Sequence, residues 1–305
     1  MKRVIQDIVR KLPFISALSD NLRLQGEFPD GHYYSPVPAK EDVITYLRTR
    51  EPLSKEIIGI NLNEQGQYDL LNEYAQFYEE IQFQEVQVSS RRYYYDNPWF
   101  SYSDAFFLYS YLRRYQPRRI IEVGSGFSSA VMLDAIDNFY LLRPEITFIE
   151  PYPDRLNSLL REIDKQQVKL IDRKIQEVSF DVFSKLKSGD FLFIDSSHVV
   201  KCGSDLQLLL FEVLPYIEAG VVVHFHDVFY PFDYPAEWLA GGRYWNENYF
   251  LRAFLSYNSE WSILFFNNYV NYIFKDLIKE KMPLCAKNPG GSLYILRDNN
   301  GGNRN

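Results

Sequence analysis

From about residue 97 onward, apolar and polar positions follow the alternating rhythm of strands and helices. An apolar, β-branched run at residues 119–123 stops at Gly124 and Gly126, and apolar residues such as Ala130 and Leu133 then recur at helical spacing. A short apolar run of this kind predicts a buried parallel strand, and a repeat near 3.6 residues predicts a helix. The junction is therefore predicted to be a tight turn that opens directly into a helix N-terminus.

Further patterns of both kinds follow this junction. Strands are predicted at 146–150, 168–172, 190–195, 220–226, 261–266 and 292–297, and helices at 153–165, 204–214 and 247–257. No clear crossover helix separates the last two strands, which favours an antiparallel hairpin at the sheet edge. The prediction is an α/β fold: a Rossmann-like, doubly wound, seven-stranded, mostly parallel sheet with helices on both faces.

The first third of the chain lacks this alternation of strand and helix patterns and is predicted to be helical. Residues 40–48 predict a short helix, and apolar positions between Leu70 and Ile81 predict one face of a longer helix. A third helix is expected to be capped by Ser103 or Asp104 and to end before the first strand.

These patterns divide the chain into an N-terminal helical cap at 1–96, a main domain at 97–298 and a tail at 299–305. The polar, glycine-rich tail predicts disorder. Residues 1–12 have apolar positions at helical spacing with charges between them, which favours packing on this domain or on a partner subunit over stable membrane insertion. A homo-oligomer is compatible with this pattern.

Composition and charge narrow the function classes. The 305 residues are 46% hydrophobic, which is enough for a large core, and the net charge of −7 argues against nucleic acid as the main partner. Cys202 and Cys285 lie far apart and form no C-x-x-C pair, so neither a disulfide framework nor a thiolate zinc site is indicated. A cytoplasmic location is the simplest expectation.

The glycine turn at 124–126 is the first candidate binding feature. Glycine permits close approach of a ligand to the backbone, and the free N–H groups of a first helical turn attract the polar end of a nucleotide-like molecule. The dinucleotide fingerprint would need a third glycine where Ser129 stands. A ligand with a nucleoside but no pyrophosphate therefore fits this turn better.

Polar residues gather at the carboxyl ends of the predicted strands, where ligands bind in such sheets. These residues are Glu122, Glu150, Asp195, His226 and Asp227. The chain has only four histidines, and His198, His224 and His226 all fall at two of these strand ends. We expect His224 to be structural, because it lies within its strand.

These residues together resemble the class I S-adenosylmethionine-dependent methyltransferases, over about residues 99–297. Residues 122–126 resemble the first motif of that family, and Glu150 resembles the acidic residue that binds the ribose hydroxyls. The resemblance implies S-adenosylmethionine as cofactor and implies a cofactor-binding set of Glu122, Gly124, Ser125, Gly126, Ser128, Glu150, Gln176 and Asp195. The adenine is expected near residues 175–177.

The stretches around Asp195 and His226 also resemble the metal-dependent, macrocin-type sugar O-methyltransferases. That resemblance implies a divalent cation, Mg²⁺ or Mn²⁺, held by Asp195, His226 and Asp227, with His198 as the general base. His226 departs from the family, which usually has an oxygen donor there, and imidazole suits manganese, iron or zinc better than magnesium. The acceptor is expected to be a small molecule such as a sugar or glycoside, covered by the aromatic loop at 228–244.

Two other function classes stay open. A non-haem iron oxygenase could use His198, His226 and either Asp195 or Asp227 as a facial triad, but this chemistry does not explain the glycine turn and Glu150. The other is a catalytically inactive nucleotide-binding protein that kept the fold.

Overall fold

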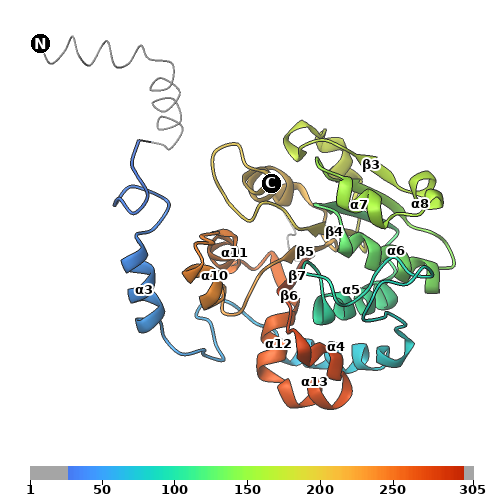
Figure 1. Ribbon diagram of the computed structural model, residues 1–305, viewed down its shortest axis with the longest axis horizontal. Coiled ribbons are helices and arrows are strands. Elements are labelled where there is room, and N and C mark those ends of the chain that lie inside the picture. Colours follow the sequence, from blue (N-terminus) through green and yellow to red (C-terminus); the bar gives the residue numbers. More distant parts are fainter. Residues whose placement is uncertain (1–26, 299–305) are drawn as a thin grey trace, which may run out of the picture. The chain divides into compact units, whose positions relative to one another are not determined.

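The computed structural model describes residues 27–298, which form two compact units. The first unit consists of residues 27–52 and Pro235–Tyr244 and contains two helices that pack on each other, α3 (Lys40–Thr49) and α10 (Ala236–Ala240). The second unit contains everything else that is described, including the whole sheet (Figure 1).

The predicted domain boundaries do not coincide with these two units. The helix expected at 1–12 and the tail expected to be disordered at 299–305 lie outside the described residues. Described residues of the expected cap, 1–96, are divided between the first unit and the second, which begins at Leu53. No helix within residues 27–298 has the length and apolar character needed to cross a membrane.

The second unit is built on a seven-stranded sheet with the order β3-β2-β1-β4-β5-β7-β6. The strands are β1 (Arg119–Val123), β2 (Glu145–Ile149), β3 (Lys169–Ile171), β4 (Phe191–Ile194), β5 (Val222–His226), β6 (Trp261–Phe266) and β7 (Ser292–Arg297). The first five pair in parallel, and β7 is antiparallel to both β5 and β6. The predicted fold class, a mostly parallel sheet with an antiparallel edge, is confirmed.

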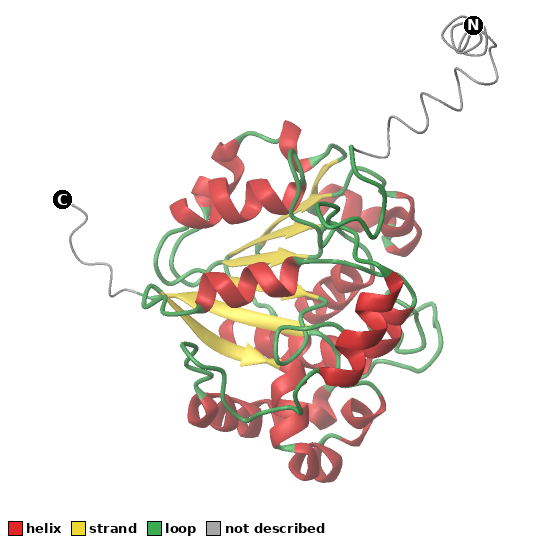
Figure 2. Ribbon diagram, turned by 90° about the vertical axis from the view of Figure 1, so that its left-hand side faces the viewer, coloured by secondary structure: helices red, strands yellow, loops and turns green. Residues whose placement is uncertain are grey.

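Helices cover both faces of this sheet (Figure 2). The α-helices of the second unit are α4 (Glu64–Ala75), α5 (Tyr102–Tyr115), α6 (Phe127–Phe139), α7 (Asp154–Leu159), α8 (Glu162–Gln167), α9 (Asp205–Leu208), α11 (Glu247–Leu255), α12 (Asn267–Ile273) and α13 (Lys275–Lys281). Strands β1 and β4 carry buried side chains at nearly every position, as expected for strands covered on both sides.

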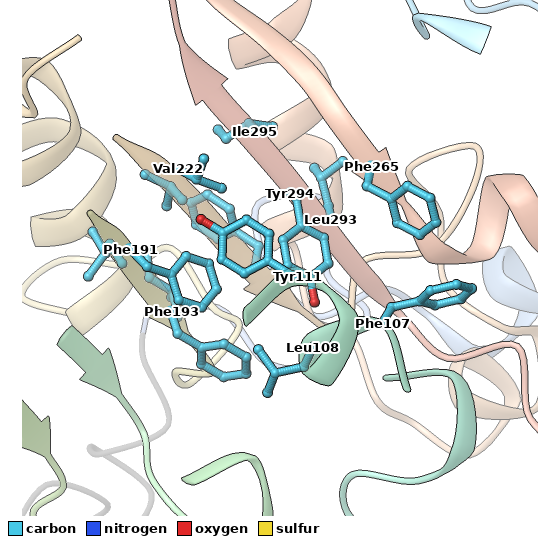
Figure 3. Packing of buried hydrophobic residues seen from close by; sticks show 14 of the residues in the cluster. Phe107, Leu108, Tyr111, Phe191, Phe193, Val222, Phe265, Leu293, Tyr294 and Ile295 are labelled. Carbon is cyan, nitrogen blue, oxygen red and sulfur yellow. The ribbon is translucent and has the colours of Figure 1, made fainter. Parts of the chain in front are cut away.

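Helix α5 contributes a continuous buried stretch to the core, because every side chain from Ser103 to Leu112 is buried. The ring of Phe107 lies 4.8 Å from that of Phe265 on β6, and the ring of Tyr111 lies 4.4 Å from that of Phe191 on β4 (Figure 3). Aromatic pairs at these distances bury large areas in well-defined geometry. This packing fixes the central strands whose carboxyl ends carry the predicted site.

The predicted antiparallel pairing of β6 and β7 is confirmed. Their connection contains α12 and α13, where the sequence pattern had shown no clear helix. Tyr269 and Val270 of α12 and Ile278 of α13 are buried. Burial of these side chains outweighs the modest helix propensity of the asparagine-rich sequence.

Several helix boundaries also differ. The single helix predicted at 153–165 is broken into α7 and α8, because Arg161 is extended and its N–H donates to the side chain of Asp164. The helix predicted at 204–214 begins as α9 but continues as a π-helix at Leu209–Val213. Helix α4 ends at Ala75, so the predicted face running to Ile81 was too long.

The start of α5 was also mispredicted. Ser101 occupies the cap position and makes no capping bond with its side chain. Ser103 and Asp104 point instead to distant partners: the hydroxyl of Ser103 donates to the backbone oxygen of Cys285, and Asp104 accepts from the hydroxyl of Ser292. Long-range hydrogen bonds have replaced the local capping role.

Candidate active site

The glycine turn after β1 has the tight geometry that its sequence predicts. Gly124 adopts a left-handed backbone conformation with φ +79°, and a Cβ built there would overlap the backbone oxygen of Asp195. The N–H of Asp195 donates to the backbone oxygen of Val123 at 2.8 Å, which joins the ends of β1 and β4. Only glycine fits such a close approach of two backbones.

A cavity of about 320 Å³ opens at these strand ends. All but two of the predicted site residues line it: Gly124, Ser125, Gly126, Ser128, Glu150, Asp195, His198, His226 and Asp227. The exceptions are Glu122 and Gln176. The structure therefore brings residues from β1, β2, β4 and β5 to one edge of the sheet, where binding sites of such folds lie.

Glu150 faces this cavity beside the glycine turn. Its carboxylate accepts hydrogen bonds from the N–H groups of Ser125 at 3.0 Å and Tyr152 at 2.8 Å. These bonds fix its orientation, and each oxygen keeps a further lone pair for a ligand hydroxyl. The geometry is compatible with the expected ribose contact, which stays a prediction.

Glu122 lies beneath the turn rather than in the cavity. It is fully buried and accepts hydrogen bonds from the hydroxyls of Ser128, at 2.6 Å, and Ser129 at the start of α6. Burial raises the pKa of Glu122 to about 8, against the opposing effect of these serine bonds. Its position supports the helix start and gives no direct access to the cavity.

Gln176 also lies away from the cavity. Its side-chain amide donates to the backbone oxygen of Gly203 at 2.9 Å. The neighbouring Ile175 is buried, and none of residues 175–177, near which the adenine is expected, lines this cavity. That position stays a prediction.

Four ionisable side chains line the cavity, Asp195, His198, His226 and Asp227, and Glu247 binds His198 from outside it; we call these five residues the site cluster. Nε2 of His198 lies 3.3 Å from Oδ1 of Asp195 and 3.7 Å from Oδ2 of Asp227. The other ring nitrogen, Nδ1, lies 2.7 Å from Oε2 of Glu247. Both His198 and Asp227 have positive φ, at 59° and 56°, a strained conformation that is common at functional sites.

The charges in the site cluster shift one another's pKa values. Burial by itself lowers the pKa of His198, but its contacts with Asp195 and Glu247 have the larger, opposite effect. The pKa of His198 therefore lies well above its usual range. Burial raises the pKa of Asp195, and the two neighbouring histidines more than offset this. The pKa values of Asp227 and Glu247 are raised, chiefly by burial. Such perturbed groups around a cavity indicate a functional site.

The two histidines of β5 have different surroundings. His226 lines the cavity, and its Nδ1 lies 3.5 Å from the hydroxyl of Ser292, which donates to Asp104. His224 is fully buried, with its ring stacked on that of Phe193 at 4.0 Å, and burial lowers its pKa well below the usual range. His224 thus occupies the interior position expected of a structural residue.

The predicted cation site is not supported by the geometry. Across residues 27–298, no three His, Cys, Asp or Glu side chains are placed to share one metal ion. Oxygens of Asp195 and Asp227 face imidazole nitrogens instead, with Nε2 of His226 3.7 Å from Oδ1 of Asp227. The residues as arranged do not fit a bound cation, and the same arrangement gives no facial triad for an iron oxygenase.

The aromatic walls of the cavity come from residues other than the predicted loop. Tyr230, Phe232 and Tyr234 are buried, and none of residues 228–234 lines the cavity. Trp99 and Trp245 line it instead. The Trp245 ring lies 4.2 Å from the ring of His198.

The residues that line or support the cavity but were not predicted as site residues are Trp99, Phe100, Phe127, Arg155, Ser196, Ser197, Trp245 and Glu247. The guanidinium of Arg155 lies 3.8 Å from the ring centre of Trp99, at the cavity wall. Glu247 is the acid that binds His198, although 49 positions separate the two in the chain. The one available signal was a lone acid opening an otherwise aromatic helical pattern.

Comparison with known proteins places residues 121–228 in a family described as a methyltransferase domain. The chain is also similar to an uncharacterized protein of Archaeoglobus fulgidus, with 33% identity over 172 residues that cover 53% of this chain and 75% of the relative.

Solved structures with a similar course of the chain include two methyltransferases. The SAH-bound methyltransferase PaMTH1 of Podospora anserina has 16% identity and a TM-score of 0.41, covering 85% of this chain and 94% of its own. The O-methyltransferase TomG of Streptomyces achromogenes, in complex with SAM, has 15% identity and a TM-score of 0.39, covering 85% and 96%.

Proposed function

We propose that this chain, which belongs to the class I S-adenosylmethionine-dependent methyltransferases, methylates a hydroxyl oxygen of a small molecule. The acceptor class is a sugar or another polyhydroxylated compound. One observation carries the proposal: His198 directs Nε2 toward Asp195 and Asp227 in the cavity that the glycine turn also lines. A hydroxyl is a poor nucleophile until it loses its proton, so a base in this position suits O-methylation.

The residues around the glycine turn fit the cofactor. Gly124 and Gly126 leave the backbone open to a ligand, and Ser125 has a buried hydroxyl without a hydrogen-bond partner among the described residues. Glu150 has lone pairs to accept from the two ribose hydroxyls. When bound, S-adenosylmethionine supplies a methyl group on a positively charged sulfonium sulfur.

His198 takes the proton in this scheme. As the oxygen–carbon bond forms and the carbon–sulfur bond breaks, the acceptor hydroxyl gives its proton to Nε2 of His198. Asp195 and Asp227 lie beside that nitrogen and stabilise the imidazolium that results. No step is assigned to a cation, because the donor atoms are not arranged to share one.

The experiment is a transfer assay with isotopically labelled S-adenosylmethionine and a panel of sugars, glycosides, other polyols and matched amines. Mass spectrometry and NMR of the product identify the atom that carries the methyl group. We expect S-adenosylhomocysteine to form only with a hydroxylated acceptor and the label to appear as an O-methyl group. Transfer to amines alone would contradict the proposed chemistry and leave only the family assignment.

A further inference from the structure

One short segment at the start of α11, Trp245-Asn246-Glu247, contacts both the backbone and the ring of His198. Glu247 binds its Nδ1 at 2.7 Å, and the ring of Trp245 lies 4.2 Å from its ring at an angle of 30°. The N–H groups of Asn246 and Glu247 both donate to the backbone oxygen of His198, at 3.2 Å each. The segment therefore fixes the backbone and the ring of His198 together.

The backbone of His198 has an unfavourable conformation that these contacts stabilise. Its φ of +59° lies in the left-handed region, which disfavours residues that carry a Cβ. A conformation of this kind persists only where the surroundings hold it. The contacts from residues 245–247 stabilise this conformation and keep Nε2 on the cavity side.

The carboxylates on the two sides of the His198 ring favour different neutral tautomers. Asp195 and Asp227 flank Nε2 and favour a proton there, which would leave no lone pair to receive the acceptor's proton. Glu247 alone favours a proton on Nδ1. The neutral tautomer of His198 thus depends on Glu247 outcompeting two carboxylates.

We propose that Glu247 is a positioning residue that holds the Nδ1–H tautomer of His198 and so keeps Nε2 free as a proton acceptor. This inference rests on the proposed role of His198 as base. Glu247 touches neither the cavity nor any reacting atom, and it acts only through His198.

The burial of Glu247 supports a positioning role over a stabilising one. Its side chain is fully buried, and Oε1 has no hydrogen-bond partner among the described residues. A buried carboxylate with one oxygen unpaired opposes folding, so an isosteric neutral side chain at this position is expected to be tolerated.

The test compares wild type with Glu247→Gln, which keeps size and shape and can either accept from or donate to Nδ1. The first readout is the ¹⁵N NMR spectrum of histidine-labelled protein at a pH where His198 is neutral, with the His198 signals assigned by their loss in His198→Ala. We expect an Nδ1–H tautomer in wild type and a shift toward Nε2–H in Glu247→Gln. This readout needs no acceptor, so it stands even where the proposed transfer reaction fails.

The second readout is kcat with the acceptor that supports transfer in wild type. Glu247→Gln is expected to lose on the order of 10²–10⁴-fold in kcat, the contribution of a correctly protonated base, with unchanged affinity for S-adenosylhomocysteine and an unchanged melting temperature. In a His198→Ala background the same substitution should have no further effect on kcat. A wild-type tautomer in Glu247→Gln, a wild-type kcat, or a full additional loss in the His198→Ala background would each overturn the proposal.

Discussion

Two groups of buried charges lie in the second unit, and they differ in how completely their atoms are paired. The Arg92 cluster consists of Arg92, Asp134, Asp137 and Asp164. Arg92 donates to Asp164 through two nitrogens, at 2.7 and 2.5 Å, and to Asp134 and Asp137 at 2.8 Å each. The site cluster has longer contacts of 3.3–3.7 Å at Nε2 of His198 and an unpaired oxygen on Glu247.

The two clusters also differ in which of their groups reach solvent. In the Arg92 cluster the side chains of Arg92, Asp134 and Asp164 are at most 2% exposed and only Asp137 is partly exposed, at 32%; in the site cluster both carboxylates beside Nε2 of His198 are partly exposed, Asp195 at 34% and Asp227 at 21%. The Arg92 cluster joins the segment before α5 to α6 and α8, with its strongest charges sealed from solvent. The site cluster keeps polar atoms available at a cavity. The fully paired charges of the Arg92 cluster stabilise the fold, whereas the incompletely paired groups of the site cluster can still bind a ligand.

The largest expected effect tests the structural side of this comparison. Arg92→Met leaves Asp134 and Asp164 buried without their cation, so the free energy of unfolding should fall by about 3–5 kcal/mol. Urea unfolding measures it, with Arg113→Met as control, because the Arg113–Glu80 pair lies at the surface and should contribute less than about 1 kcal/mol. Equal losses in the two variants would remove the distinction between the clusters.

The next effect concerns the cofactor side of the cavity. Glu150→Ala removes the acceptor proposed for the ribose hydroxyls and should weaken binding of S-adenosylhomocysteine by roughly 1.5–3 kcal/mol for each charge-assisted bond lost. Calorimetry measures the affinity. Glu145→Ala, at the exposed opposite end of β2, is the control and should bind as wild type does. Equal affinity in wild type and Glu150→Ala would withdraw the ribose assignment.

Glu122 gives a smaller, pH-dependent effect on stability. Because its pKa rises from an unfolded value near 4.5 to about 8, folding becomes less favourable as pH increases between these values. Wild type should lose up to about 1.4 kcal/mol per pH unit in that window, and Glu122→Gln should lack this loss. Thermal unfolding from pH 5 to 8 measures the difference, and parallel curves for the two proteins would show that Glu122 ionises normally.

The smallest expected effect is a shift in the pH–rate profile. His198 must be neutral to accept a proton, so kcat/KM should rise with pH through a limb well above the ordinary histidine value. Asp195→Asn removes one of the contacts that raise the pKa of His198, and the limb should move to lower pH. A limb that stays in place, whatever the loss in rate, would show that another group is the base.

The strand ends were predictable because the information is local. Glu150 and Asp195 directly follow apolar runs, Asp227 follows the strand at 222–226, and a parallel sheet brings such ends to one edge. The side-chain direction of Glu122 could not be predicted, because a strand buried on both faces has no alternation to show which way a side chain points. Its side chain turns toward the serines of α6.

Glu247 could not have been found in this way. Its role depends on how α11 packs against the loop after β4, a contact between positions far apart in the chain. The division of the predicted helix at 153–165 has a similar origin, because Asp164 is drawn into the Arg92 cluster. Local patterns thus describe the sheet and its ends, and tertiary contacts decide the positioning residues.

The most direct test of the account is single-turnover kinetics of His198→Ala beside its affinity for S-adenosylhomocysteine. The account predicts wild-type affinity and a loss of methyl transfer on the order of 10²–10⁴-fold at a temperature where the variant is folded, because the proton acceptor is removed. The melting temperature should fall, because Glu247 stays buried without its partner. A variant that transfers methyl groups within a few-fold of the wild-type rate would show that His198 is structural and that the acceptor loses its proton elsewhere.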